Sequence, residues 1–412
     1  MIDYDKWQEI FTSLQQHKLR TFLTAFSVWW GIFMLVILLG AGTGLENSIT
    51  HNFRDDAINS IWVFPGETSK PYKGLPVGRR ISIDNDDFDK TSKIDGVRLT
   101  TGRYYLNGTF FISKGDKSFS YDVRSVHPAH QVVENTMVTE GRYINDLDIQ
   151  KTRKVCVIGR TVKESFFEEE ESVLGEYLQV KGIEYKIVGV FTDSGSPREM
   201  EKIYLPISTS QKVDGTDRLN MLIYEIGDAS LEESLVIEEK IKNQFALKHK
   251  FSNSDERAVY VRNGIESYEE FQTVFTFIRG FIWFVGIGSI IAGVIGVSNI
   301  MLIIVKDRTK EIGVRKALGA TPWSIITMIV QEAIFLTGIA GYVGLASGLG
   351  IIYGLQQIMV QNDIEIEYFR NPEVNTSVVV AALFILILSG AVAGLIPALQ
   401  AVRVNPVTAM KS

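Results

Sequence analysis

The sequence predicts an α-helical membrane protein with four transmembrane helices and a large α+β periplasmic domain, carried on a helical stalk between spans 1 and 2. Four long stretches lack Asp, Glu, Lys and Arg, and a helix needs about 20 mainly apolar residues to cross the hydrocarbon core of a bilayer. Between the first two stretches lies a polar segment that is far too long for a linker. The charge-free stretches are residues 21–45, 280–305, 333–362 and 374–402.

Other classes of protein fit the sequence less well. A soluble protein would need four buried helices of unusual length. A hydrophobic content of 46% excludes a disordered chain, and a single cysteine excludes a disulfide scaffold. The apolar core of the first stretch, residues 22–39, is longer than the roughly 7–15 residues of a signal peptide. We therefore expect an uncleaved first span.

The distribution of charge predicts the orientation. Residues 1–20, 306–323 and 402–412 together carry a net charge of +5, which leaves −11 on the rest of the chain. Basic segments next to membrane spans remain in the cytoplasm. We therefore expect a multi-pass membrane protein with both termini cytoplasmic and the large domain on the opposite side of the membrane.

The elements follow from this arrangement in chain order. Residues 1–20 place Trp7, Ile10, Phe11 and Leu14 near helical spacing, which predicts an amphipathic helix on the cytoplasmic surface. The further expected segments are transmembrane helix 1 (21–44), the periplasmic stalk and core domain (45–270), the stalk end with helix 2 (271–305), a coupling loop or helix (306–323), helix 3 (324–360), a short periplasmic loop (361–376), helix 4 (377–401) and a cytoplasmic tail (402–412).

Short β-like runs mixed with a few helices predict the α+β class of the large domain. Residues 45–61 and 264–279 are expected to be helices continuous with the spans, and independent short helices separated by hinges remain the alternative. Residues 65–80, rich in proline and glycine, are expected to form an exposed loop. Expected strands are 60–64, 104–112, 118–123, 154–158, 177–180 and 185–191, and expected helices are 161–167 and 231–245.

No catalytic constellation emerges from the motifs. The dipeptide Gly-Lys is absent, so the sequence contains no phosphate-binding loop of the Walker type. His127 and His130 are separated by Pro128 and are interpreted as a solvated turn rather than a metal pair. The acids at 168–171 are expected on a solvated face. Cys156 lies in an apolar run and is expected to be a small buried hydrophobe.

The segment 306–322 has a composition of its own. Ile312, Val314 and Leu318 alternate with charged residues, which predicts a short amphipathic helix that Gly319 ends before Pro322 opens the next helix. A basic cluster that merely fixes topology is the alternative. The interleaved acids at 307 and 311 favour a surface that docks a partner protein.

These residues resemble the signature of MacB/FtsX-type ABC permeases. The resemblance begins with KDRTKEIGVRKALGAT at 306–321, preceded by SNIML at 298–302. It continues through QEA at 331–333, GLIPA at 394–398 and AVRVNP at 401–406. Residues 139–143, 155–159 and 187–191 resemble the MacB periplasmic core domain. The resemblance covers nearly the whole chain.

The resemblance implies a location in the bacterial inner (plasma) membrane, with both termini cytoplasmic and the large domain periplasmic, and a function without catalysis by this chain. Such subunits form homodimers or heterodimers and carry periplasmic heads that move when cytoplasmic subunits hydrolyse ATP. MacB has its ATPase fused before the first span, whereas only twenty residues precede the span here, so a separate ABC ATP-binding subunit is expected. ATP and Mg²⁺ would bind that partner, and no cofactor or metal is expected on this chain. A periplasmic adaptor, a TolC-like outer-membrane protein and membrane lipid complete the expected partners, and nucleic acid is not among them.

The resemblance also implies site residues. The coupling helix would span residues 307–318, with Glu311, Arg315 and Lys316 contacting the ATPase. Glu332 is an intramembrane polar candidate that either has a functional or packing partner or faces the headgroups. Glycines at 286–288 and 338–350 are expected to permit close helix packing. The full set of expected ATPase-coupling residues is Asp307, Arg308, Lys310, Glu311, Gly313, Arg315, Lys316 and Gly319.

The expected function is that of a permease subunit that couples ATP hydrolysis to movement of the periplasmic domain, for export or efflux of an unidentified substrate. Release of lipoproteins, as in LolC/LolE, and activation of a cell-wall hydrolase, as in FtsX, remain alternatives with the same architecture. A membrane-anchored enzyme or receptor is the alternative from a different class. The missing catalytic motifs and the unusual 306–322 segment argue against it.

Overall fold

The computed structural model describes residues 18–55, 58–108, 110–168, 172–193, 198–362, 366 and 369–404. The chain divides into unit 1, residues 1–49 and 273–412, and unit 2, residues 50–272. Most of the predicted amphipathic helix at 1–20 and most of the acidic run at 168–171 lie outside the described residues.

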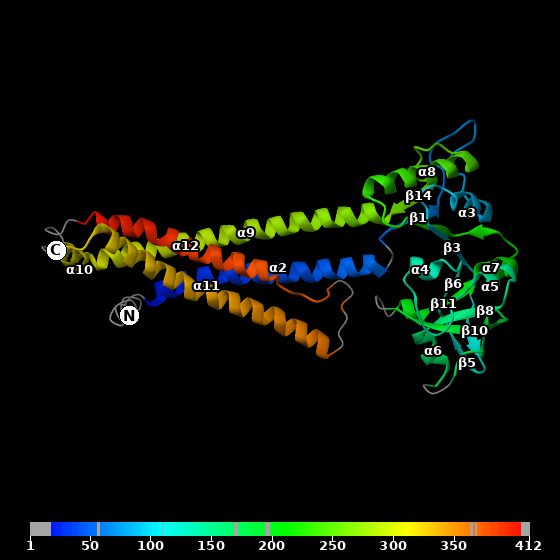
Figure 1. The fold of residues 1–412 in the computed structure, drawn as a ribbon, viewed down its shortest axis with the longest axis horizontal. Helices are drawn as coiled ribbons and strands as arrows, with labels where there is room; N and C mark the ends of the chain where they lie inside the picture. The colour runs from blue at the N-terminus through cyan, green and yellow to red at the C-terminus, as the bar shows by residue number, and fades with distance from the viewer. Residues whose placement is uncertain are drawn as a thin grey trace. The chain divides into compact units, whose positions relative to one another are not determined.

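Four helices are long and apolar enough to cross a membrane within the described part of the chain. They are α2 (Lys18–Asp55), α9 (Gly264–Asp307), α11 (Pro322–Gln361) and α12 (Thr376–Val402), and Figure 1 shows them as long rods. The predicted membrane class is thereby confirmed. Helix α9 is continuous over 44 residues, but α2 ends before the predicted residue 61. Ser60 and Ile61 instead form strand β1, because their backbones pair with neighbouring strands.

Glycines bring the helices of unit 1 into close contact at some positions and not at others. A Cβ on Gly341 would overlap Leu386 of α12, and one on Gly348 would meet Val36 of α2. Gly338 and Gly350 face open space. Small residues therefore permit close packing at part of the predicted stretch, and the sequence alone did not distinguish the two kinds of position.

Unit 2 is built on a mixed sheet, ordered β14-β1-β13-β3-β6-β11-β8-β10-β9-β4-β5 among the described residues, with β7 paired to β10. The β8–β10 and β6–β11 pairs are parallel and the others are antiparallel. A separate small sheet pairs β2 with β12. The strands are β1 (Ser60–Pro65), β2 (Ile83–Asp84), β3 (Leu99–Tyr105), β4 (Ile112–Lys114), β5 (Lys117–Phe119), β6 (Asp122–Val126), β7 (Met137–Gly141), β8 (Val155–Gly159), β9 (Tyr177–Val180), β10 (Ile183–Thr192), β11 (Lys202–Pro206), β12 (Arg218–Leu219), β13 (Met221–Glu225) and β14 (Val259–Asn263).

Helices complete this mixed α/β domain, as Figure 1 shows within unit 2. The longest, α8, buries Ile241 and Phe245 in the main hydrophobic core, which also contains Cys156. The predicted strand and helix near these residues, at 154–158 and 231–245, are confirmed. The helices are α3 (Asn85–Thr91), α4 (His130–Val133), α5 (Asp146–Gln150), α6 (Arg160–Phe166), α7 (Ile207–Asp214), α8 (Leu231–His249) and the 3₁₀ turn η1 (Glu199–Glu201).

Two predicted strands were wrong in extent. The run 104–112 is interrupted because the Asn107 amide donates to the carboxylate of Asp214 at 3.0 Å, and not to a neighbouring strand. Gly108 then turns the chain with a φ of 88°. The run 118–123 is divided between β5 and β6, because β5 pairs with β4 whereas β6 pairs with β3 and β11.

The interpretation of the histidine pair as a solvated turn was correct for the turn, in which the His130 amide donates to the carbonyl oxygen of His127 at 3.1 Å, and wrong for the solvation. His130 begins α4 and is fully buried, with its ring 5.0 Å from that of Tyr204 in an edge-on contact. His127 stacks on Phe88 and its Nδ1 accepts the amide of Gly102 at 2.9 Å. Burial lowers the pKa of His127 to about 4 and that of His130 well below its usual range. The lowered pKa values favour neutral rings, and His130 Nε2 lies 3.5 Å from the carboxylate of Glu134.

Candidate functional site

The segment that resembled a family signature forms a short helix between two spans. Helix α9 ends at Asp307, α10 runs over Thr309–Ala317, and Gly319 leaves the helical conformation with a φ of 96°. Thr321 caps the next helix by accepting the amide of Ser324, and Pro322 occupies its first turn. The α10 helix is therefore slightly shorter than the predicted 307–318, and its end and the following start are where the glycine and proline predicted them.

One face of α10 is buried against the spans. Ile312 is 2% exposed and belongs to a hydrophobic cluster with Ile304 of α9 and Ile325 of α11. The backbone at Gly313 is buried beside it. Burial of this apolar face fixes α10 to unit 1, since a nine-residue helix is marginal in isolation.

Arg308 connects this helix to the third span. Its guanidinium donates to Glu311 of α10 through Nε at 2.8 Å and Nη2 at 3.0 Å, and through Nη1 to Glu332 of α11 at 3.4 Å. Glu332 is 3% exposed, so the structure places this carboxylate in an ion pair inside the protein. Arg315 Nη2 approaches Glu311 at 2.8 Å from the next turn. The hydrogen bonds from Arg308 hold the pKa of Glu311 below its ordinary value.

Lys316 connects the other end of α10 to the fourth span. Its ammonium donates to the carbonyl oxygens of Val402 and Val404, each at 2.7 Å. Helix α12 ends at Val402, where carbonyl groups lack helical partners and the helix dipole is negative. Lys316 therefore acts as a C-terminal cap supplied by another helix.

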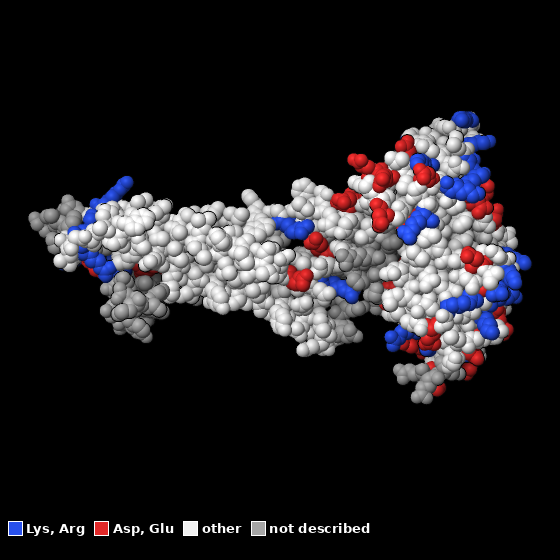
Figure 2. All heavy atoms as spheres, in the orientation of Figure 1, with Lys and Arg blue, Asp and Glu red and all other residues white. Residues whose placement is uncertain are grey.

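The outward face of α10 consists of different residues. Lys310, Val314 and Leu318 lie at positions i, i+4 and i+8, and all three are exposed, Leu318 at 83%. Trp323 at the start of α11 is 74% exposed. Figure 2 shows Lys and Arg side chains gathered at the end of unit 1 that carries α10, next to a region of uncharged atoms. This end thus presents apolar side chains among basic ones.

The structure separates the predicted coupling residues into two groups. Glu311, Arg315 and Lys316 are half-buried and engaged within the chain. Lys310 and Asp307 are exposed. The sequence pattern grouped Val314 and Leu318 with Ile312 as the apolar side chains of this helix. In the structure Ile312 is buried, whereas Val314 and Leu318 are exposed beside Lys310 at the four-residue spacing of a single helix face.

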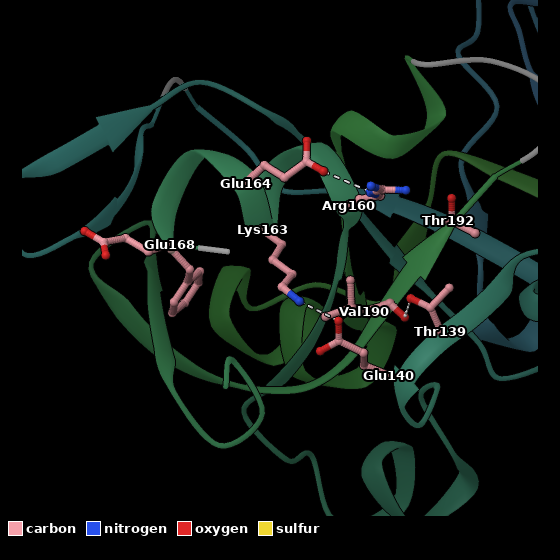
Figure 3. A pocket seen from close by; sticks show the side chains of 9 residues that line it. Thr139, Glu140, Arg160, Lys163, Glu164, Glu168, Val190 and Thr192 are labelled. Atoms are coloured by element: carbon pink, nitrogen blue, oxygen red, sulfur yellow. Dashed lines mark hydrogen bonds and ion pairs between the residues drawn. The ribbon is translucent and has the colours of Figure 1, made fainter. Parts of the chain in front are cut away.

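Unit 2 contains a cavity lined by charged side chains. It measures about 650 Å³ and lies between β7, β10 and α6, as Figure 3 shows. Lys163 pairs with Glu140, and Arg160 pairs with Glu164 across one helical turn. These four charges satisfy each other, so they point to a solvated groove in the domain and not to a ligand site.

The family models match two parts of the chain. The MacB-like periplasmic core domain matches residues 21–236, and the FtsX-like permease C-terminal domain matches residues 283–406. The chain belongs to the MacB/FtsX family of ABC transporter permeases. The α10 segment lies within the permease match, between its first two spans.

Three relatives are similar to this permease over nearly its whole length. The macrolide export ATP-binding/permease protein MacB of Hyphomonas neptunium is 26% identical over 98% of the chain and 60% of its own length. The uncharacterized ABC transporter permease YvrN of Bacillus subtilis is 26% identical over 97% of the chain and 98% of its own length. An uncharacterized ABC transporter permease of Methanocaldococcus jannaschii is 25% identical over 97% and 96%, respectively. The chain thus spans about 60% of the length of the MacB relative.

Proposed function

We propose that this permease is the membrane subunit of an ABC machine in which a separate cytoplasmic ATP-binding subunit moves the spans and, through them, unit 2. The single observation that carries the proposal is the construction of α10. Its inner face and both ends are fastened to the membrane helices, and its outer face is exposed and partly apolar.

The fastening lets α10 transmit force. Arg308 joins α10 to α11 through Glu332, and Lys316 joins α10 to the end of α12. Breaking a buried ion pair by losing one partner costs about 3–5 kcal/mol, whereas exposed ion pairs contribute little. A displacement applied to α10 would therefore carry α11 and α12 with it before these contacts break.

The outer face supplies the contact with the partner. Val314 and Leu318 are apolar, and Lys310 adds a positive charge on the same side. An apolar anchor that fills a groove on a partner, surrounded by charge, is the usual anatomy of a protein interface. We therefore assign docking to these residues, and assign Glu311, Arg315 and Lys316 to holding the helix in place.

The remaining parts of the proposal follow from the family and the charge pattern. The basic α10 end faces the cytoplasm of a bacterial inner membrane, and both termini lie on that side. ATP and Mg²⁺ bind the partner subunit, and a second permease subunit completes the dimer. A periplasmic adaptor and a TolC-like duct belong to the export form of the machine. The name of the MacB relatives makes a macrolide the first substrate class to test.

Purification of the tagged permease from its native membrane tests the proposal. We expect vanadate-sensitive ATP hydrolysis to copurify with the chain, and Leu318→Glu to abolish both the association and the activity. Lys306→Glu is the control, because Lys306 is also exposed but belongs to α9, before the break at Arg308 where α10 begins. Absence of a copurifying ATPase, or an equal loss in the control variant, would exclude the proposed coupling.

A further inference from the structure

A short segment between the third and fourth spans crosses the first span. We call residues 369–375 the strap. The Arg370 amide donates to the carbonyl oxygen of Gly44 at 3.0 Å, and Asn47 Nδ2 donates to the carbonyl oxygen of Asn371 at 3.0 Å. Both Gly44 and Asn47 belong to α2, so backbone groups of the strap bind the first span directly.

The contact depends on a glycine in the middle of a helix. A Cβ on Gly44 would lie 2.7 Å from Cε2 of the Phe369 ring, closer than side chains approach each other. A glycine inside a helix costs about 1 kcal/mol relative to alanine. Glycine at position 44 has this cost, but its missing side chain leaves room for the ring of Phe369 against the helix backbone.

The strap is also fastened to the spans on either side of it. Asn375 caps α12 by accepting the amide of Ser377 at 3.1 Å. Val374 packs against a cluster that contains Val36 of α2 and Leu345 of α11. The strap is therefore continuous with the capped start of α12 and packs on a cluster shared by the spans, while it binds α2.

Helix α2 continues without interruption from Gly44 to Asp55. At the same level, α2 contacts α9 through the Glu46–Arg279 ion pair at 3.5 Å, whose arginine is half exposed. An exposed ion pair of this kind contributes little to stability. Helix α2 also packs against α9 through a buried cluster of Leu35, Leu39 and Ile282, so this ion pair is only part of their contact.

We propose that the strap is a positioning element that carries displacements of the α11–α12 pair to α2, through Phe369 on Gly44 and the two hydrogen bonds beside it. This inference rests on the proposed function, because that function supplies the displacement. It goes beyond that function by naming the strap as a place where movement passes from the third and fourth spans to the first, in addition to the direct packing of α11 on α2 at Gly348. In this arrangement the part of α2 that binds the strap moves together with the start of α12.

Gly44→Ala is the test variant. The added methyl group pushes against the Phe369 ring, whereas helix propensity improves, so any loss comes from the strap contact. Gly42→Ala is the matched control, because its Cβ would meet only Ile282 at 3.6 Å. Phe369→Ala added to Gly44→Ala makes room for the methyl group and is expected to relieve the overpacking. Overpacking of this kind lowers the ratio of the strap bound to α2 over the strap detached from α2 by about tenfold.

The measurement is a distance between nitroxide labels at Leu45 of α2 and Thr376 of α12, recorded by pulsed electron spin resonance on the permease with its ATPase in nanodiscs. Leu45 and Thr376 are exposed, and the native Cys156 is buried and remains unlabelled. In the unsubstituted background and the Gly42→Ala variant we expect one narrow distance, unchanged by ATP plus vanadate. In Gly44→Ala we expect a broad distribution while ATP hydrolysis continues, and a narrower one in the double variant.

The outcomes separate the two proposals. A narrow distribution in Gly44→Ala without nucleotide overturns the strap contact, whatever the ATPase does. A distance that changes with ATP plus vanadate in the unsubstituted background shows that α2 and α12 move independently, which overturns the transmitting role alone. Absence of any ATP-dependent change in a second label pair, at Leu45 and Phe277 of α9, in a sample that hydrolyses ATP overturns the proposed function and with it the source of the movement.

Discussion

Replacing Lys316 by methionine tests whether α10 is fastened to the last span. The substitution keeps the length and apolar stem of the side chain and removes the ammonium. In the structure this ammonium donates at 2.7 Å to the carbonyl oxygens of Val402 and Val404. Without it, the final carbonyl groups of α12 must accept hydrogen bonds from water instead, and the negative end of the helix dipole loses its nearby cation.

The size of the effect follows from this geometry. Hydrogen bonds from a charged donor contribute about 1.5–3 kcal/mol, and water can replace part of this at a half-exposed site. A cation at a helix C-terminus contributes about 0.3–1 kcal/mol. We therefore expect the last turn of α12 to lose about 1–2 kcal/mol, which raises the population of its open form by about 5–30-fold.

Hydrogen exchange measured by mass spectrometry on the detergent-solubilised permease gives this quantity directly. The amides of Arg403 and Val404, which bond to Gln400 and Ala401, should exchange faster by that factor in Lys316→Met. Lys310→Met is the control, because Lys310 is on the same helix and exposed. Equal exchange in both variants, or acceleration spread evenly over all four spans, would refute the reasoning.

Three further predictions concern packing, reactivity and pH. Gly341→Ala should destabilise the pairing of α11 with α12 by about 1–3 kcal/mol, because its Cβ would overlap Leu386, while Gly338→Ala should be neutral in thermal unfolding. The Cys156 thiol is fully buried and burial raises its pKa, so a maleimide should react with it only after denaturant is added; rapid labelling of the native protein would contradict this. Burial raises the pKa of Asp148, but hydrogen bonds from Arg142 and the Asn145 amide outweigh it, so the folded-state pKa lies below the ordinary value of 3.8. Unit 2 should therefore keep this stabilisation above about pH 4 and lose it as the pH falls through the lower folded value, and Asp148→Asn should flatten that part of a pH titration of unfolding.

The strong periodic and compositional signals predicted much of the fold. Charge-free stretches identified all four spans, because any helix in hydrocarbon must be apolar along its length. Gly319 and Pro322 predicted where α10 ends and α11 begins, because their restrictions are local to the backbone. Interpretations that depended on distant neighbours were less successful, as the half-buried His127 and the fully buried His130 show.

The candidate site shows the same division. Its place in the chain and its mixed charge could be read from residues 306–322. Which charges hold α10 and which surface remains for a partner could not, because Glu332 and Val402 lie 24 and 86 residues from the residues they bind. The strap contact likewise could not be predicted from the sequence, because Gly44 and Phe369 are far apart in the chain and come into contact only in the folded structure.

The sequence by itself thus determined the membrane class, the four spans, the mixed large domain and the short helix between two spans, because hydropathy and backbone restrictions act over a few neighbouring residues. The tertiary structure alone decided that Arg308, Glu311 and Lys316 fasten this helix and that Lys310, Val314 and Leu318 face outward. It also decided which glycines are packing sites. These outcomes depend on which helices pack side by side, and that arrangement comes from the summed burial of surfaces far apart in the chain.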